Sequence, residues 1–158
     1  EITTEGGLDL ISQFDRLKSI CHQLNDNDLR ISLFIEPDLR QIETAVRLEV
    51  PVIELHTGTY SELRGDDKKK ELKRIQRAVD YANELGIECH AGHGLNYENV
   101  GPIASIEKIT ELNIGHFLIG ESIFIGLTNA IDKMKRIMAE ARKVEVSNND
   151  SPYNKRAL

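Results

Sequence analysis

The sequence contains no tryptophan, and aromatic residues make up only 5% of it. A buried core must therefore be built mainly from isoleucine, leucine, valine and alanine. No apolar run approaches the roughly 20 residues that a membrane-spanning helix requires, so we expect a soluble protein. The chain also lacks an initial methionine, and residues 1–7 have the polar, glycine-bearing character of a loop that follows a strand. We therefore expect a fragment of a longer protein.

Cysteine and positive charge are also scarce. Cys21 and Cys89 are the only cysteines, without CxxC spacing or a signal peptide, which favours a reducing cytoplasm. The formal net charge of −6, from 26 acidic and 20 basic residues, disfavours nucleic-acid binding. The lysines at 68–70 lie among acidic residues, and we interpret them as the solvated start of a helix.

What the sequence does contain is a regular alternation of strand-like and helix-like segments. A chain of 158 residues buries roughly 70% of its unfolded surface, enough for one domain with a true core. Apolar residues at spacings of three and four predict helices, and short apolar runs predict strands. The expected helices lie at about 8–26, 37–46, 68–85, 100–106 and 127–141, the strands at 31–35, 50–57, 87–91 and 116–120, and a loop at 57–67.

This alternation predicts an α/β fold with a parallel sheet and helical crossovers. An open flavodoxin-like sheet is one form of it, and a (β/α)8 TIM barrel of about 250 residues is another. Four strands preceded by a loop fit half a barrel. We predict that residues 1–143 are part of a single barrel domain and that residues 144–158 form a polar, flexible tail.

Polar residues gather near the ends of these strands, where parallel sheets place their active sites. His93 lies between two glycines after the third strand, and it is either a loop histidine hydrogen-bonded to backbone or a group that transfers protons near neutral pH. Glu54 interrupts an apolar strand, so it either pairs with an arginine or points into a cavity. His116 and Thr3 would face the same site.

Two ligand classes are disfavoured. Gly92-His93-Gly94 begins a G-x-G pattern, but Tyr97 occupies the position of the third glycine, so the dinucleotide fingerprint fails. His56, His90, His93 and Glu54 could in principle ligate a metal. Because His90 and His93 are expected on opposite faces of a strand, we predict no metal site.

Four segments together resemble one known family. The resemblance is to pyridoxine 5′-phosphate synthases, and the segments follow in the same order. They are residues 3–9 (TTEGGLD), 53–58 (IELHTG), 91–95 (AGHGL) and 111–116 (ELNIGH). The resemblance implies a (β/α)8 barrel, of which this chain covers the C-terminal half to two-thirds. It also implies condensation of 1-deoxy-D-xylulose 5-phosphate with 3-amino-2-oxopropyl phosphate, which closes the pyridine ring of vitamin B6 and releases phosphate and water.

The resemblance further assigns roles to residues. It implies that His93 is the proton donor and that Glu54 stabilises charge in the transition state. Thr3 would contact the deoxyxylulose phosphate, and Gly94, Gly115 and His116 would hold the amino-oxopropyl phosphate. Members of the family form homo-octamers and need no metal, and we expect no other cofactor.

One part of the family pattern has no counterpart here, namely the N-terminal portion that supplies the first strands, a substrate clamp and two basic groups. We therefore expect this chain alone to be inactive. Two alternatives stay open at this point. One is a catalytically incomplete half-barrel that only self-associates through its exposed strand edges. The other is a metal-dependent barrel aldolase or isomerase.

Overall fold

The computed structural model describes residues 6–149, and side chains up to residue 143. The chain divides into two compact units. The first comprises residues 1–94 and 108–113, and the second comprises residues 95–107 and 114–158. None of the helices within the described residues is long and apolar enough to cross a membrane.

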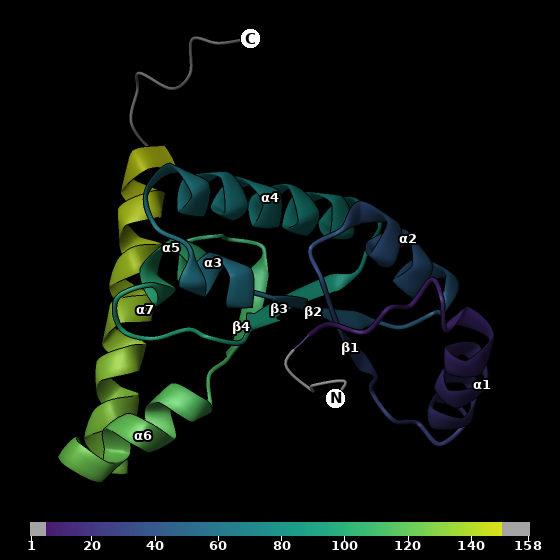
Figure 1. The fold of residues 1–158 in the computed structure, drawn as a ribbon, viewed down its shortest axis with the longest axis horizontal. Helices are drawn as coiled ribbons and strands as arrows, with labels where there is room; N and C mark the ends of the chain where they lie inside the picture. The colour runs from purple at the N-terminus through teal and green to yellow at the C-terminus, as the bar shows by residue number, and fades with distance from the viewer. Residues whose placement is uncertain (1–5, 150–158) are drawn as a thin grey trace, which may run out of the picture. The chain divides into compact units, whose positions relative to one another are not determined.

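A four-stranded parallel sheet forms the centre of the first unit (Figure 1). Its strands are β1 (Ser32–Ile35), β2 (Val52–His56), β3 (Glu88–Gly92) and β4 (Ile109–Asn113), and they are hydrogen-bonded in that order. Every neighbouring pair is parallel. The predicted α/β class with a parallel sheet is therefore confirmed.

Four helices belong to the same unit: α1 (Phe14–Asn25), α2 (Leu39–Arg47), α3 (Gly58–Glu62) and α4 (Gly65–Glu84). Helix α2 contacts β1 and α4, and α4 contacts β3. The side chains buried in this unit are mainly aliphatic, as the shortage of aromatic residues predicts. They include Ile35, Ile42, Ile53, Leu55 and Ile75, with Tyr60 as a fully buried exception.

Local chemistry explains where two of these helices begin and end. Asp38 caps α2, because its side chain accepts a hydrogen bond of 2.8 Å from the backbone N–H of Arg40. Pro37 therefore precedes the cap, and its predicted place in the first helical turn is wrong. Helix α4 ends at Glu84, and Gly86 follows with a φ of +77°, a conformation that glycine adopts without strain.

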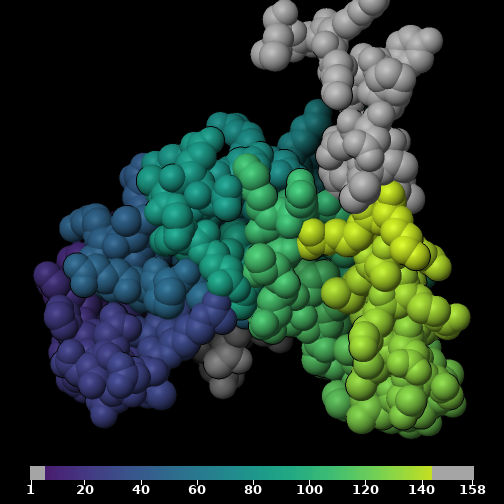
Figure 2. All heavy atoms as spheres, turned by 180° about the vertical axis from the view of Figure 1, so that it is seen from behind, coloured from purple at the N-terminus to yellow at the C-terminus, as the bar shows by residue number. Residues whose placement is uncertain are grey.

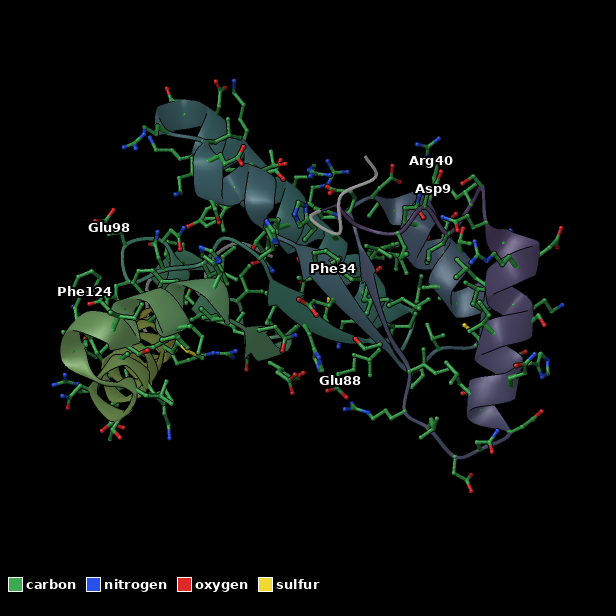
Figure 3. All side chains as sticks on the ribbon, turned by 60° about the horizontal axis from the view of Figure 1, so that its bottom comes forward. Asp9, Phe34, Arg40, Glu88, Glu98 and Phe124 are labelled. Carbon is green, nitrogen blue, oxygen red and sulfur yellow. The ribbon has the colours of Figure 1, made fainter. Side chains whose placement is uncertain are left out.

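Before α1, the chain forms a turn where the sequence predicts the helix to start. Asp9 accepts hydrogen bonds from Gln41 at 3.0 Å and from the backbone of Ser12 at 3.3 Å, and these bonds lower its pKa to about 2. Arg40 also lies close to Asp9 (Figure 3). The helix expected from residue 8 therefore begins only at Phe14. The loop expected over 57–67 likewise contains the short helix α3 and the start of α4.

The fourth strand is the clearest error of the sequence-based prediction. Residues 116–120 begin helix α6 (His116–Ile125), and the strand is instead β4 at Ile109–Asn113. The short apolar run at 117–119 fits a buried strand and a helix equally well, so periodicity alone could not decide. The correction places Gly115 and His116 after the carboxyl end of a strand and not at the start of one.

The second unit consists of α5 (Val100–Ala104), α6 and the long helix α7 (Leu127–Asn149). Helix α7 packs against both α5 and α6, and α6 and α7 are the green and yellow elements in Figure 2. The closing helix predicted from residue 127 is therefore confirmed. Of the tail predicted over 144–158, residues up to Asn149 continue α7, and the rest lies outside the described residues.

Ile53 provides a test of the sheet core, since it lies in the middle of β2 and is fully buried. We expect Ile53→Ala to lower the free energy of unfolding by about 2–5 kcal/mol, because it removes buried methyl groups and leaves a cavity. The control is Leu29→Ala, at a side chain that is 55% exposed, which should change stability by less than about 0.5 kcal/mol. Urea unfolding followed by circular dichroism measures both, and equal losses would contradict the assigned core.

Candidate active site

One face of the sheet in the first unit carries a concentration of polar side chains. The strand register aligns Phe34, Glu54, His90 and Glu111 in one row across the four strands. Because paired residues of parallel strands point to the same face, these four side chains share it. Figure 3 shows Phe34 on its strand in this part of the sheet.

The next row of the same face lies at the carboxyl ends of the strands. There His56 pairs with Gly92, and Gly92 pairs with Asn113. Residues 93 and 94 follow directly after β3, and residue 57 follows β2. The sequence-predicted residues Glu54, His93 and Gly94 are therefore brought to one end of one sheet.

Glu54 is half-buried beneath this end. A side chain at Gly92 would place its Cβ 2.2 Å from the Glu54 Oε1 atom, so only glycine leaves space for the carboxyl group. Burial raises the pKa of Glu54 above its ordinary value, and the nearby Glu111 adds to this rise. A hydrogen bond with Asn113 and the charges of His90 and His56 act in the opposite direction. Its hydrogen-bond partner in the structure is thus an amide and not the arginine that one of the two sequence-based alternatives named.

His93 has an unusual backbone conformation, with a φ of +80°. A non-glycine residue in this region is strained by about 1–3 kcal/mol and persists only when its surroundings hold it. Thr57 provides that hold. Its hydroxyl lies 2.7 Å from the carbonyl oxygen of Gly92 and 2.6 Å from that of His93, and its backbone N–H donates to Gly92 at 2.8 Å. The His93 residue itself is exposed, so its imidazole is accessible to a ligand.

A different neighbouring side chain explains each of the two glycines beside His93. Gly92 makes space for Glu54, as described above. Gly94 has a φ of +75°, and a Cβ there would lie 2.8 Å from the side chain of Ser61. Both glycines therefore allow another group to come close to the backbone. In this structure the approaching groups are the Glu54 carboxyl and the Ser61 hydroxymethyl.

His56 lies next to His93, and the distance between their ring centroids is 4.8 Å. The Nδ1 atom of His56 is 2.7 Å from Glu36 Oε1. Its Nε2 atom is buried and has no hydrogen-bond partner within the described residues. A buried polar atom without a hydrogen bond lowers the free energy of unfolding by about 1–3 kcal/mol, so the presence of a buried histidine at position 56 needs a physical reason.

Glu36 connects His56 to helix α4. The Arg74 guanidinium lies 3.4 Å from Glu36 Oε2 and 2.6 Å from Oε1 of the buried Glu71. Both carboxylates raise the pKa of Arg74, Glu71 more than Glu36. Sequence reasoning missed Glu36, Arg74 and Glu71 as parts of the site. Glu36 carried a usable signal, since it is a polar residue directly after a predicted strand.

His90 lies deeper on the same face and is 4% exposed. Its Nε2 atom is 2.8 Å from Glu88, and its Nδ1 atom is 3.6 Å from Glu111. Hydrogen bonds from His90, Arg30 and Thr110 lower the pKa of Glu88 to about 2. Across residues 6–149, no three histidine, cysteine, aspartate or glutamate side chains form a group that could hold a metal ion.

The other predicted site residues fall elsewhere. Thr3 lies outside the described residues. Gly115 and His116 belong to the second unit, where Gly115 is the N-cap of α6 and His116 is its first residue, and both are exposed. Their approach to His93 stays a prediction.

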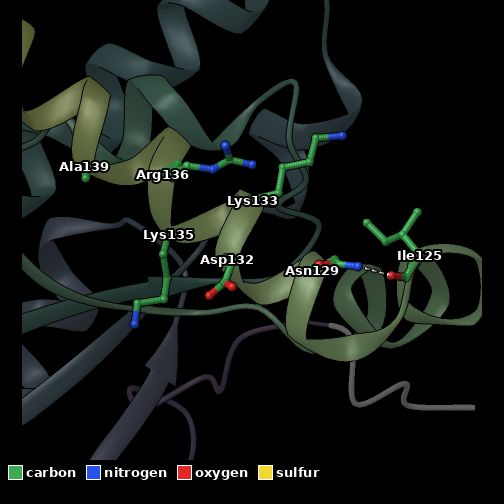
Figure 4. A pocket seen from close by; sticks show the side chains of 7 residues that line it. All are labelled: Ile125, Asn129, Asp132, Lys133, Lys135, Arg136 and Ala139. Atoms are coloured by element: carbon green, nitrogen blue, oxygen red, sulfur yellow. Dashed lines mark hydrogen bonds between the residues drawn. The ribbon is translucent and has the colours of Figure 1, made fainter.

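The second unit also has an open hollow along α7, and Figure 4 shows the side chains that line it. In this hollow the Asn129 amide donates to the Ile125 carbonyl at 2.7 Å, and Lys133 lies over the Tyr97 ring at 4.1 Å. None of the predicted site residues lines it. The residues that line the hollow are Ile125, Asn129, Asp132, Lys133, Lys135, Arg136 and Ala139.

The surroundings of Glu54 lead to a test by titration. We expect carboxyl-carbon NMR to give Glu54 a pKa above the ordinary glutamate value of 4.5, and a higher one still in Asn113→Ala, which removes a bond that lowers it. Since the folded pKa exceeds the unfolded one, Glu54 reduces stability as pH rises from its unfolded pKa through its folded pKa. Glu54→Gln should reduce that loss. A Glu54 pKa at or below 4.5 would contradict the burial described here.

Comparison with known proteins shows which family the chain resembles. Residues 1–140 match the family described as pyridoxal phosphate biosynthesis protein PdxJ. The chain is 56% identical over 142 residues to pyridoxine 5′-phosphate synthase of Zymomonas mobilis, covering 90% of this chain and 56% of the relative. It is 48% identical over 143 residues to the enzyme of that name from Sulfurihydrogenibium, covering 90% of this chain and 59% of the relative.

A third relative, pyridoxine 5′-phosphate synthase of Rhodospirillum rubrum, is 51% identical over 142 residues, with 89% of this chain and 57% of the relative covered. The chain thus spans somewhat more than half the length of these curated relatives. The predicted fold class is confirmed, since four parallel strands alternate with helices in a family of TIM barrels. The match over nearly the whole chain shows that it belongs to the pyridoxal phosphate biosynthesis protein PdxJ family.

Proposed function

We propose that this chain supplies catalytic residues to a pyridoxine 5′-phosphate synthase. The reaction condenses 1-deoxy-D-xylulose 5-phosphate with 3-amino-2-oxopropyl phosphate, closes a pyridine ring, and releases phosphate and water. The family match over residues 1–140 is the observation that carries this proposal. The position of Glu54 on β2 and of His93 directly after the adjacent strand β3, at the end where parallel sheets carry their chemistry, supports it.

His93 is the proton donor in this proposal. Imine formation and the later dehydrations each expel a hydroxyl group, which leaves as water once it is protonated. An imidazole exchanges protons near neutral pH, and His93 is exposed at the end of β3 with its backbone held by Thr57. A fixed donor beside the substrate lowers the barrier of each such step, and the imidazole takes up a proton again before it serves the next one.

Glu54 stabilises positive charge on the reacting nitrogen. Condensation of an amine with a carbonyl passes through cationic species, and a carboxylate next to them lowers their energy. Burial favours the neutral form of Glu54 in the free protein. A cation that arrives in the site favours the ionised form of the carboxyl group, which opposes the effect of burial.

The remaining predicted residues bind the phosphorylated substrates. The backbone N–H groups of Gly94 and Gly115 are suitable donors to phosphate, and His116 adds a hydrogen bond to the same substrate. Thr3 contacts the deoxyxylulose phosphate. Residues 1–143 form part of one (β/α)8 barrel domain. The protein works in the cytoplasm as a homo-oligomer, an octamer, and takes small phosphorylated substrates.

His93→Asn in the full-length enzyme tests the proton donor. We expect kcat to fall by about 10²–10⁴-fold with KM changed only slightly, because the donor acts on the barrier and not on substrate binding. The matched control is His22→Asn on the exposed surface of α1, which should retain full activity. A raised KM with unchanged kcat would show that His93 only binds substrate.

The 158-residue chain by itself provides another test of the proposed function. We expect no pyridoxine 5′-phosphate from it, because it corresponds to 56–59% of the length of its relatives, and the family resemblance places two basic groups in the remainder. Product formation is measured by chromatography with both substrates present, and full-length enzyme is the positive control. Multiple turnovers by the 158-residue chain would refute the prediction and assign all the acid–base groups to it.

A further inference from the structure

We propose that His56 is a positioning residue for His93, that Glu36 and Arg74 hold His56 in place, and that Gly58 provides the space in which the two imidazoles meet. The proposal rests on the proposed function, because it takes His93 as the proton donor. The geometric part, that His56 fixes the orientation of the His93 ring, can be tested without any catalytic activity.

The rings themselves give the first argument. Thr57 fixes the backbone of His93 but leaves its side chain free to rotate, so the ring needs a neighbour to define its direction. His56 lies against it at 4.8 Å between centroids, with the ring planes inclined by 49°. Phe34 meets His56 edge-on at 5.2 Å and lies 6.5 Å from His93. The exposed His93 ring therefore lies against the buried His56 ring and near the half-buried Phe34 ring.

His56 can orient the His93 ring only if its own ring is held in one position. When its Nδ1–H is donated to the Glu36 carboxylate, this bond of 2.7 Å selects one tautomer and one ring orientation. Among the described residues, the buried Nε2 atom has no hydrogen-bond partner, so this part of the chain satisfies only one of the two ring nitrogens. A histidine retained only for the stability of the fold is expected to have both nitrogens hydrogen-bonded when buried.

Glu36 is held in turn by helix α4. Arg74 lies between Glu36 and Glu71, and its Nη1 atom also donates to the backbone carbonyl of Pro37 at 3.1 Å. This anchor comes from a segment 38 residues further along the chain than Glu36. Glu71, Arg74, Glu36 and His56 thus form a continuous chain of contacts from α4 through the end of β1 to the end of β2.

Gly58 explains how the two imidazoles can approach each other. A Cβ at this position would lie 2.6 Å from His56 Nε2, 2.7 Å from its Cε1 and 3.0 Å from His93 Cδ2. The first two distances are shorter than van der Waals contact allows, so a methyl group would displace the rings. Gly58 is the first residue of α3, and its φ is not positive, so alanine suits its backbone. Gly58→Ala therefore changes the ring contact with little backbone strain.

The first experiment follows the histidine side chains by NMR in the 158-residue chain with labelled histidine. We expect Gly58→Ala to shift the ring resonances of both His56 and His93, and Glu36→Leu to change the tautomer of His56 and shift His93 with it. Gly120→Ala is the control, since its helical Cβ would meet nothing within 4 Å, and it should leave both rings unchanged. An unchanged His93 ring in both Gly58→Ala and Glu36→Leu would overturn the proposal.

The second experiment measures turnover in the full-length enzyme. We expect kcat per folded molecule to fall by about 10–100-fold in Gly58→Ala and in Glu36→Leu with KM within about twofold, because a misplaced donor slows the chemical step. Glu36→Gln keeps an oxygen that can accept from Nδ1–H, so it should recover most of the loss seen in Glu36→Leu. A lower melting temperature with unchanged kcat in these variants would assign the contacts to stability and overturn the proposal.

The two experiments separate this proposal from the proposed function. If the wild-type full-length protein forms no product, the proposed function is refuted, and the ring resonances still decide whether His56 orients His93. If the wild type is active and the His93 ring does not respond to Gly58→Ala or Glu36→Leu, only the positioning proposal is refuted. Should Gly58→Ala fail to fold, the pair Glu36→Leu and Glu36→Gln provides the same comparison.

Discussion

The contact of Thr57 with the end of β3 is the constraint on which the candidate site depends. Its hydroxyl and its backbone N–H together engage the carbonyl groups of Gly92 and His93, and so continue the pairing of β2 and β3 beyond the last strand residues. These bonds hold His93 at a φ of +80°, which an unsupported histidine would avoid. The strain is thus offset by hydrogen bonds that the parallel register itself brings within reach.

The same sheet face gives its carboxyl groups different properties. Glu54 is half-buried and loses solvation, which raises its pKa, whereas Glu88 accepts hydrogen bonds from His90, Arg30 and Thr110, which lower its pKa to about 2. Environments that separate the pKa values of like groups separate their roles. Glu88 is therefore held as a negative charge within an ion-pair cluster, whereas burial favours the neutral form of Glu54.

The sequence predicted the parallel sheet because three of its strands are short, largely apolar runs that alternate with helical patterns, and it pointed to His93 and Glu54 because each interrupts a local pattern. It misplaced the fourth strand because the run after Gly115 is apolar enough for either a strand or a helix, while β4 is polar at Glu111 and Asn113. It could not predict the contacts of His56 with Glu36, or of Glu36 with Arg74. These join residues 20 and 38 positions apart, and tertiary packing alone sets them.

The most direct measurement is a crystal structure of the full-length protein with pyridoxine 5′-phosphate bound. The proposed function predicts that the pyridine ring lies at the carboxyl ends of β2 and β3, with a polar atom within hydrogen-bond distance of the His93 imidazole and the Glu54 carboxyl group beside it. Product bound away from both residues, with His93 in contact only with protein atoms, would contradict the assignment of this strand end as the active site.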